Sequence, residues 1–164
     1  MLIIFSGLPG VGKTTVARQV AGRIRAAYVR VDSIEQTLAA ASGGGPIGAE
    51  GYLVAYRVAA DNLALGLPVV ADCVNASDVP RSAWRQVAQA HGGRHLFVHV
   101  VCSDLQEHRR RVEQRQPDLP GHVLPAWSAI STMQFDPPPP DALVLDSAGL
   151  GPDEAPEQVI RRIP

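Results

Sequence analysis

The run L-I-I-F-S-G-L-P-G-V-G-K-T-T, at residues 2–15, combines the signals of a strand, a phosphate-binding loop and a helix. Its first four residues are apolar and include two isoleucines, which is typical of a buried strand. Residues 7–14 match the pattern G-x-x-x-x-G-K-[ST] at every defined position. Val16, Val20 and Ile24 follow at intervals of four, which predicts an amphipathic helix over residues 14–25. This is the order of elements in which the loop pattern binds phosphate.

The residue types of the loop suit a ligand with several negative charges. Its three glycines let the backbone adopt positive φ values and approach the ligand closely. Backbone N–H groups would converge at the start of a helix, where the helix dipole also favours anions. Lys13, the only lysine in the chain, would reach the β- and γ-phosphates, and the Thr14 hydroxyl would bind Mg²⁺. The predicted nucleotide-binding residues are Gly7, Leu8, Pro9, Gly10, Val11, Gly12, Lys13, Thr14 and Thr15.

The overall composition excludes several classes of protein. The chain has 164 residues, enough for one domain with a sizeable core, and we expect residues 1–164 to form a single unit. A net charge of -1 does not indicate a nucleic-acid or anionic-membrane surface. No apolar stretch approaches the length of about 18 residues that a membrane span needs. Cys73 and Cys102 lack metal-ligand spacing, so we expect buried free thiols. A cytoplasmic protein fits these features.

Strand and helix patterns alternate along the whole chain. Further strands are expected at residues 27–31, 67–71, 96–101 and 142–145. Further helices are expected at residues 33–41, 50–65, 79–91, 104–115, 127–133 and 154–162, with a breaker-rich loop at 42–48. Five strands alternating with helices predict an α/β fold with a parallel sheet covered on both faces. Ligands of such sheets bind at the carboxyl ends of the strands, where Asp32, Asp72 and Asp146 fall.

The phosphate loop alone does not select among the classes of P-loop protein. A regulatory GTPase normally carries an N-K-x-D motif, which is impossible here because Lys13 is the only lysine. An ABC ATPase needs an L-S-G-G-Q-like motif, and S-G-G-G at 42–45 is better interpreted as a flexible loop. AAA+ motors carry a second helical domain, for which the chain has no room. Small P-loop kinases remain.

Several further stretches, taken in order, resemble one branch of P-loop proteins. They are V-D-S-I at 31–34, V-V-A-D-C-V-N at 69–75, C-S-D-L-Q-E-H-R-R-R-V-E-Q-R at 102–115, L-P-A-W at 124–127 and L-V-L-D-S-A-G at 143–149. This branch comprises small-molecule kinases, often described as an AAA-type ATPase domain, and is similar to chloramphenicol phosphotransferase, zeta toxins and the kinase domain of polynucleotide kinases. The resemblance implies a three-layer P-loop fold with strand order 2-3-1-4-5 and ATP-dependent, Mg²⁺-dependent phosphorylation of a hydroxyl.

Two aspartates are the main candidates for catalysis and metal binding besides Lys13. In the implied strand order Asp32 faces the γ-phosphate, and a matching aspartate in the family accepts the proton of the attacking hydroxyl. The alternative is that Asp32 only caps the following helix. Asp72 would hold Mg²⁺ or position the substrate, unless it only forms a turn with Asn75. Asn75 resembles a residue of the D-x-x-N pattern in polynucleotide kinase-like relatives, which makes it a further substrate candidate.

The charged helix at 104–115 allows two interpretations. Glu107 with Arg111, and Arg109 with Glu113, have the spacing of exposed ion pairs on a solvated face. Alternatively the helix begins a lid over residues 105–135, in which Arg111 and Arg115 act on the ATP phosphates or the adenine ring. We favour the lid and count both arginines as catalytic. The resemblance also places Ser147 and Gly149 at the adenine, although a generic turn explains them almost as well.

The sequence therefore predicts an ATP-dependent kinase that phosphorylates a small-molecule hydroxyl, such as that of an antibiotic, a nucleoside-like compound or another metabolite. Residues 42–51 and 74–85 are expected beside Asp32 and Asp72 and would form the acceptor pocket. A 5′-hydroxyl nucleic-acid kinase is an alternative that the composition disfavours, because it needs a basic groove. A non-catalytic, ATP-binding regulatory protein is a second alternative. The sequence does not indicate the oligomeric state.

Overall fold

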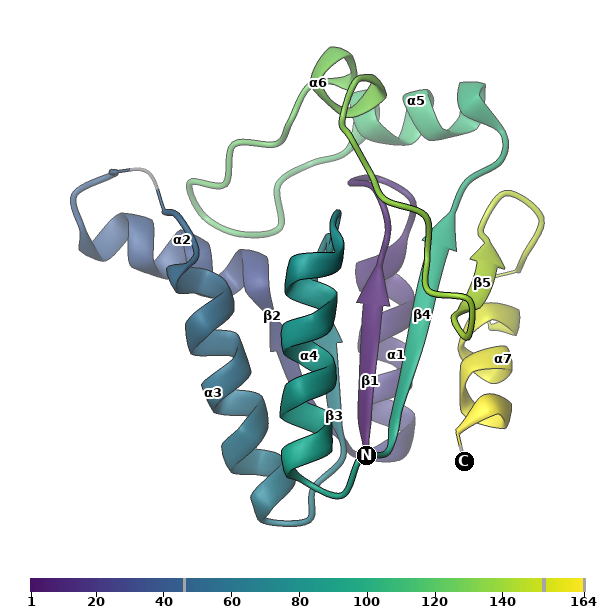
Figure 1. The fold of residues 1–164 in the computed structure, drawn as a ribbon. Coiled ribbons are helices and arrows are strands. Elements are labelled where there is room, and N and C mark those ends of the chain that lie inside the picture. The colour runs from purple at the N-terminus through teal and green to yellow at the C-terminus, as the bar shows by residue number, and fades with distance from the viewer. Residues whose placement is uncertain (46, 152, 164) are drawn as a thin grey trace.

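Five parallel strands form the centre of the computed structural model, which describes residues 1–45, 47–151 and 153–163 (Figure 1). The strands are β1 (Leu2–Ser6), β2 (Ala27–Arg30), β3 (Val69–Asp72), β4 (His95–Val101) and β5 (Leu143–Asp146). Their order in the sheet is β2-β3-β1-β4-β5, and every neighbouring pair is parallel. The expected α/β class and strand order are confirmed.

Helices cover both faces of the sheet. The helices are α1 (Lys13–Ile24), α2 (Val31–Ala41), α3 (Glu50–Ala64), α4 (Asp78–Ala90), α5 (Leu105–Gln114), α6 (Trp127–Ser131) and α7 (Glu154–Arg162). Figure 1 shows α3 and α4 in front of the sheet, α1 behind it and α7 beside β5. It also shows α5 and α6 above the carboxyl ends of the strands. The charged helix α5 and the short helix α6 therefore lie at the end of the sheet where ligands are expected.

The alternation of side chains on β1 explains the two cores. Ile3 and Phe5 pack into a cluster with Val16 and Val20 of α1. Leu2 and Ile4 point to the other face and pack into a cluster with α3 and α4, which includes the fully buried Trp84. A strand buried on both faces fixes the position of the loop that follows it. The two cysteines are buried and free, as expected.

One boundary differs from the expectation in a way that matters for the site. β2 ends at Arg30 and α2 begins at Val31, so Asp32 lies in the first turn of a helix and not at the end of a strand. The sequence extended the strand to Val31 because a buried β-branched residue fits a strand as well as a helix. Pro46, in the expected loop over 42–48, lies outside the described residues. In the part of the chain that is described, no helix has the length and apolar character needed to cross a membrane.

Candidate active site

The phosphate loop joins β1 to α1, and its glycines shape it. Gly12, the residue before α1, has a φ of 96° and a ψ of 7°, a conformation that strains residues with side chains. Gly10 has a φ of 85°, and a Cβ atom there would collide with the Val112 side chain of α5. The loop therefore curls into the start of α1 while α5 packs directly against it.

Lys13, the first residue of α1, is buried within this loop, with 7% of its surface exposed. Its Nζ donates a hydrogen bond to the Leu8 carbonyl oxygen at 2.9 Å. Burial lowers the pKa of Lys13, while the charges of Asp72 and Asp32 oppose that shift. A buried ammonium ion is unfavourable unless anions accompany it, so this position favours a ligand that brings negative charge.

Asp72 ends β3 and lies beside Phe5 of β1 in the sheet register. Its side chain is buried, and the Tyr28 hydroxyl donates to its Oδ2 atom at 2.6 Å. Burial, followed by the charge of Asp72, raises the pKa of Tyr28, so the hydroxyl stays a donor. The sequence analysis missed Tyr28. Its place on β2, the neighbour of β3, is the signal that could have found it.

Asp32 lines the same cleft as Lys13 and Asp72. The N-cap residue of α2 is Arg30, and no side-chain cap hydrogen bond forms there within the described ranges of the chain. The alternative interpretation of Asp32 as a helix cap is therefore wrong. The carboxylate faces Arg30 instead, with 3.5 Å between Oδ2 of Asp32 and Nη2 of Arg30. Asp32 is thus left to face the cleft.

Arg30 is a second residue that the sequence analysis missed. Its side chain is only 2% exposed, and it forms a two-pronged ion pair with Asp118, at 2.6 and 3.0 Å. Its hydrogen bonds hold the pKa of the Asp118 carboxyl well below its usual range, although burial acts in the opposite direction. An arginine at the end of an apolar strand, two residues before Asp32, was the available signal. Its partner, 88 residues away, was not predictable from local patterns.

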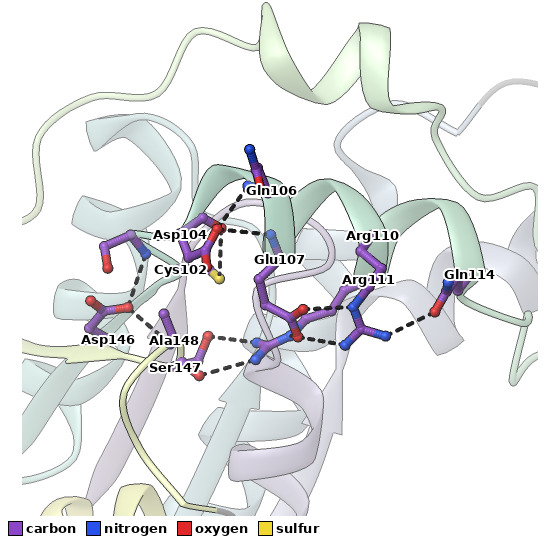
Figure 2. A network of polar contacts seen from close by, with 11 residues as sticks. Cys102, Asp104, Gln106, Glu107, Arg110, Arg111, Gln114, Asp146, Ser147 and Ala148 are labelled. Carbon is purple, nitrogen blue, oxygen red and sulfur yellow. Dashed lines mark hydrogen bonds and ion pairs between the residues drawn. The ribbon is translucent and has the colours of Figure 1, made fainter.

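Helix α5 contacts the loop after β5 through Arg111 (Figure 2). Its Nη1 donates to Ser147 Oγ at 2.9 Å, and its Nη2 donates to the Ser147 carbonyl oxygen at 3.2 Å. Asp146 holds that loop by accepting hydrogen bonds from the Ser103 and Ala148 N–H groups, each at 3.0 Å. Ser147 also lies next to the phosphate loop, since a Cβ on Gly12 would be 4.0 Å from its Cβ. α5, the phosphate loop and the β5 loop therefore meet at one place.

Both ion pairs expected on α5 form. Glu107 pairs with Arg111 and Arg109 pairs with Glu113, each at 2.7 Å. Glu107 also accepts from Arg110, and hydrogen bonds from the two arginines lower the pKa of Glu107 to about 2. The interpretation as a solvated face thus describes Arg109, which is 60% exposed, whereas Arg111 reaches the neighbouring loop.

His108 links α5 to the phosphate loop. It is buried, its Nε2 donates to the Pro9 carbonyl oxygen at 2.8 Å, and its ring packs edge-on against Trp127 of α6. His108 is internally satisfied, but its partner is the phosphate loop. A histidine one turn before Arg111 and Val112, on the face that carries Val112, was the signal for burial.

Asn75 and Arg81 support the walls of the cleft. Asn75 is fully buried, and its Nδ2 donates to the Phe5 carbonyl oxygen at 2.9 Å. The Arg81 guanidinium is also buried and donates to the carbonyl oxygens of Asn75, Asp136 and Pro137. These contacts link the chain at residues 136 and 137 to α4. Within 74–85, an expected part of the acceptor pocket, Arg81 and Trp84 are thus core residues.

These elements enclose a cleft of about 670 Å³. Of the residues predicted for the site, those that line it are Pro9, Gly10, Gly12, Lys13, Thr14, Thr15, Asp32, Asp72, Arg111 and Arg115. The predicted residues outside this lining, among those described, are Gly7, Leu8, Val11, Asn75, Ser147 and Gly149. The lining carries five cationic side chains, of Lys13, Arg18, Arg110, Arg111 and Arg115, and three carboxylates, of Asp32, Asp72 and Asp118. A chain with a net charge of -1 thus concentrates positive charge where phosphates would lie.

The described residues contain no group of three or more His, Cys, Asp or Glu side chains that could hold a metal ion by themselves. Mg²⁺ in nucleotide sites is usually held by one or two protein oxygens together with phosphate oxygens and water. Thr14 and Asp72 line one cleft and fit that pattern. They stay predictions as ligands of Mg²⁺.

The model of a family described as an AAA domain matches residues 2–130. The chain belongs to this family. The match covers the phosphate loop, Asp32, Asp72 and α5. No curated protein sequence matches the chain.

Solved structures with the same fold align with almost the whole of this chain. A sugar kinase from Janibacter sp. HTCC2649 is 20% identical, with a TM-score of 0.69, over 98% of this chain and 92% of that one. A gluconokinase from Sinorhizobium meliloti 1021 is 20% identical, with a TM-score of 0.65, over 98% and 92%. The APS kinase of Mycobacterium tuberculosis, in complex with AMPPNP and APS, is 21% identical, with a TM-score of 0.72, over 98% and 95%. At these identities the likeness shows a shared fold.

Proposed function

We propose that the protein is an ATP-dependent kinase that transfers the γ-phosphate to a hydroxyl group of a small molecule. One observation carries this proposal. A single cleft of about 670 Å³ is lined by the buried amine of Lys13 and by the carboxylates of Asp32 and Asp72. Phosphoryl transfer needs positive charge on the phosphates and a group that orients the attacking hydroxyl, and little else. Both requirements meet in this cleft.

The residues present fit ATP and Mg²⁺. The left-handed Gly12 leads into the first turn of α1, whose free N–H groups suit a phosphate. The buried Lys13 ammonium lacks a full complement of anions, which a triphosphate would provide. Thr14 and Asp72 offer the oxygen atoms that Mg²⁺ prefers. When bound, ATP supplies the phosphoryl group and Mg²⁺ neutralises part of its charge.

The side chains of the cleft have different roles in this reaction. Lys13 and Arg111 hold the charge of the phosphates, and Arg115 lines the same cleft within 4.0 Å of the Asp118 carboxylate. Asp32 orients the acceptor hydroxyl and takes its proton as the acceptor oxygen bonds to the γ-phosphorus and ADP leaves. α5 covers the phosphate loop through His108 and Val112 and excludes water from it. Ser147, held by Arg111, borders the adenine side.

The comparisons support a small molecule as the acceptor. Three solved structures with this fold are named as a sugar kinase, a gluconokinase and an APS kinase. A cleft of about 670 Å³ has the size of a small-molecule site and not of a groove for a long polymer. We infer that the acceptor is a metabolite-sized compound.

A transfer screen with γ-labelled ATP and Mg²⁺ tests the proposal. The acceptors are sugars, sugar acids, nucleosides, adenosine 5′-phosphosulfate, aminoglycosides, phenicols and a 5′-hydroxyl oligonucleotide. The wild type, Asp32→Asn and Asp61→Asn are compared, because Asp61 is an exposed carboxylate on α3 paired with Arg57 and serves as a matched control. Label transfer that Asp32→Asn abolishes and Asp61→Asn retains is the expected result.

Two outcomes contradict the proposal. Tight ATP binding without transfer to any acceptor class would indicate a nucleotide-binding regulatory protein. Transfer restricted to the oligonucleotide would replace the small-molecule acceptor with a nucleic acid. Transfer that persists in Asp32→Asn would leave a kinase but remove Asp32 as its base.

A further inference from the structure

Three arginines converge on the carboxylate of Asp118. Arg30 Nη1 and Nη2 lie 2.6 and 3.0 Å from its two oxygens, and Arg18 Nη2 lies 2.7 Å from Oδ2. Arg115 Nη2 lies 4.0 Å from Oδ1. The arginines come from α1, from the end of β2 and from the residue after α5. Three cations from separate elements around one carboxylate form a site shaped for a planar or tetrahedral oxyanion.

The local charge is not balanced by Asp118. Apart from Asp118, the acidic side chain within ion-pair distance of these arginines, among the described residues, is Asp32 at 3.5 Å from Arg30. Three guanidinium groups therefore face two carboxylates. Arg30 is 2% exposed in its side chain, and its Nε has no hydrogen-bond partner among the described atoms. A buried guanidinium normally has all its donors paired, so Arg30 with Asp118 is not fully satisfied and positive charge remains for an anion that takes the place of Asp118.

Asp118 belongs to a segment that can exchange for such a group. Residues 115–126 link α5 to α6. Within the described residues, the Asp118 carboxylate makes the only hydrogen bonds that join this segment to α1 and β2. The Asp118 side chain is 35% exposed and Arg18 is 51% exposed, so water and solutes reach the pair. The Arg18–Asp118 pair is exposed and contributes little free energy, so a competing anion meets the site first at Arg18. The pair with the buried Arg30 is stronger and has to be replaced by an anion that accepts the same two hydrogen bonds.

The site lies on the side of the cleft away from Ser147. β2 stands two strands from β1 in one direction, and β5 stands two strands from it in the other. Arg30 and Asp32 follow β2, whereas Ser147 follows β5. Arg18, Arg115 and Asp118 line the same cleft as Asp32. An anion bound by these arginines would therefore be part of the molecule whose hydroxyl faces Asp32.

We propose that the phosphate acceptor carries an anionic oxygen group, a carboxylate, sulfate or phosphate, which Arg18, Arg30 and Arg115 bind in the place that the Asp118 carboxylate takes in this structure. The inference rests on the proposed kinase function and adds the substrate class to it. Asp118 acts as an internal competitor that occupies the site until the acceptor arrives. The segment 115–126 loses its link to α1 and β2 when the acceptor binds.

The direct test is a calorimetric titration with inorganic sulfate. The full chain is first saturated with AMPPNP and Mg²⁺, so that the phosphate loop is filled. Asp118→Asn should bind sulfate at least tenfold more tightly than the wild type, because the competing charge is gone. Arg18→Gln should bind it at least tenfold more weakly, and Arg18 is exposed enough for the variant to fold. Asp61→Asn, which also releases an arginine from an aspartate, should bind sulfate as the wild type does.

The opposite interpretation makes Asp118 a permanent strap that holds the segment closed. It predicts that Asp118→Asn binds sulfate no better than the wild type, and that result would overturn the proposal. An equal gain in Asp61→Asn would overturn it too, since the effect would then be one of net charge.

Matched acceptors identify the source of the anion. The ratio of kcat/KM for gluconate to that for glucose, and for adenosine 5′-phosphosulfate to that for adenosine, is measured in the wild type and in Arg18→Gln. In the wild type we expect a ratio above tenfold in one of the two pairs, and the pair that shows it tells a carboxylate from a phosphosulfate. Arg18→Gln should lose this preference while its KM for ATP stays unchanged. Transfer only to neutral acceptors would overturn the anionic acceptor and leave the kinase intact. Absence of any transfer would overturn the kinase, while the sulfate titration still decides the anion site.

Discussion

The two sides of the cleft are built in different ways. The phosphate loop is one continuous stretch, residues 7–14, and its form depends on glycine backbone and on the first turn of α1. The Asp32 side is assembled from side chains of α1, β2, α2 and the segment after α5, which meet through Arg30 and Asp118. One side is coded by backbone conformation and the other by contacts between distant side chains.

This difference teaches where specificity resides. Backbone N–H groups recognise any phosphate chain, so the phosphate loop can be shared by proteins that act on unrelated substrates. Arginines and carboxylates placed by separate elements recognise one shape and charge, so the Asp32 side can change without disturbing the loop. We expect substitutions on the Asp32 side to alter turnover or acceptor choice, and substitutions in the loop to alter ATP binding.

The largest effect is expected for Asp32→Asn. Asparagine keeps the size of the side chain but cannot take up the hydroxyl proton, so kcat should fall by about 10²–10⁴-fold, as is typical of lost general base catalysis. ATP affinity, measured by calorimetry, should stay within about twofold, because the phosphate loop is shaped by its own backbone. A loss of ATP affinity equal to the loss of kcat would contradict the division between the two sides.

Lys13→Met should give the next largest effect, and this effect should fall on the use of ATP. Methionine fills similar space without the ammonium charge, so kcat/KM for ATP should fall by about 10²–10³-fold, as when one charge-stabilising donor is removed. The melting temperature should not fall, because the variant no longer buries a charge whose pKa is lowered by desolvation. ATP binding that survives in a folded Lys13→Met would show that the loop holds the nucleotide through its backbone alone.

The same contrast explains what could be predicted from the sequence. The sheet order and the limits of α7, residues 154–162, followed from periodicity and from the resemblance of ordered motifs. The phosphate loop followed from a contiguous pattern. The Arg30–Asp118 and His108–Pro9 contacts join residues 88 and 99 positions apart, and no local pattern encodes such a distance. The start of α2 was misplaced because burial of Val31 is compatible with both kinds of element.

Arg111→Gln should have a smaller effect, confined to the nucleotide. The variant loses two charged hydrogen bonds from α5 to Ser147, and the Kd for AMPPNP should rise about tenfold, at the low end for charge-assisted bonds. Arg109→Gln is the matched control, because Arg109 is an exposed neighbour that pairs with Glu113 on the same helix. Both values are measured by calorimetry with Mg²⁺ present. Equal Kd values for the two variants would show that Arg111 and its contact with Ser147 play no part in nucleotide binding.

The smallest expected effect is on the pH dependence of stability, to which the two sides of the cleft should contribute differently. His99 of β4 is buried, shares a hydrogen bond of 2.9 Å with Ser6 Oγ just before the phosphate loop, and has a pKa lowered from 6.5 by burial and by the charges of Arg81 and Lys13. The unfolded chain therefore takes up a proton at His99 before the folded protein does, and the free energy of unfolding should fall as pH drops below about 6.5. The pKa of Asp118 is lowered below 3.8 by Arg30, so its contribution is complete above that pH and is lost only in stronger acid.

Urea unfolding between pH 8 and 5 measures this difference. His99→Gln should flatten the pH dependence by up to one proton per molecule. Asp118→Asn should lower stability by a similar amount at every pH in this window and leave the slope unchanged. A slope that Asp118→Asn flattens would mean that the ion pairs beside Asp32 titrate near neutral pH, and the Asp32 side would then be less firmly assembled than its hydrogen bonds indicate.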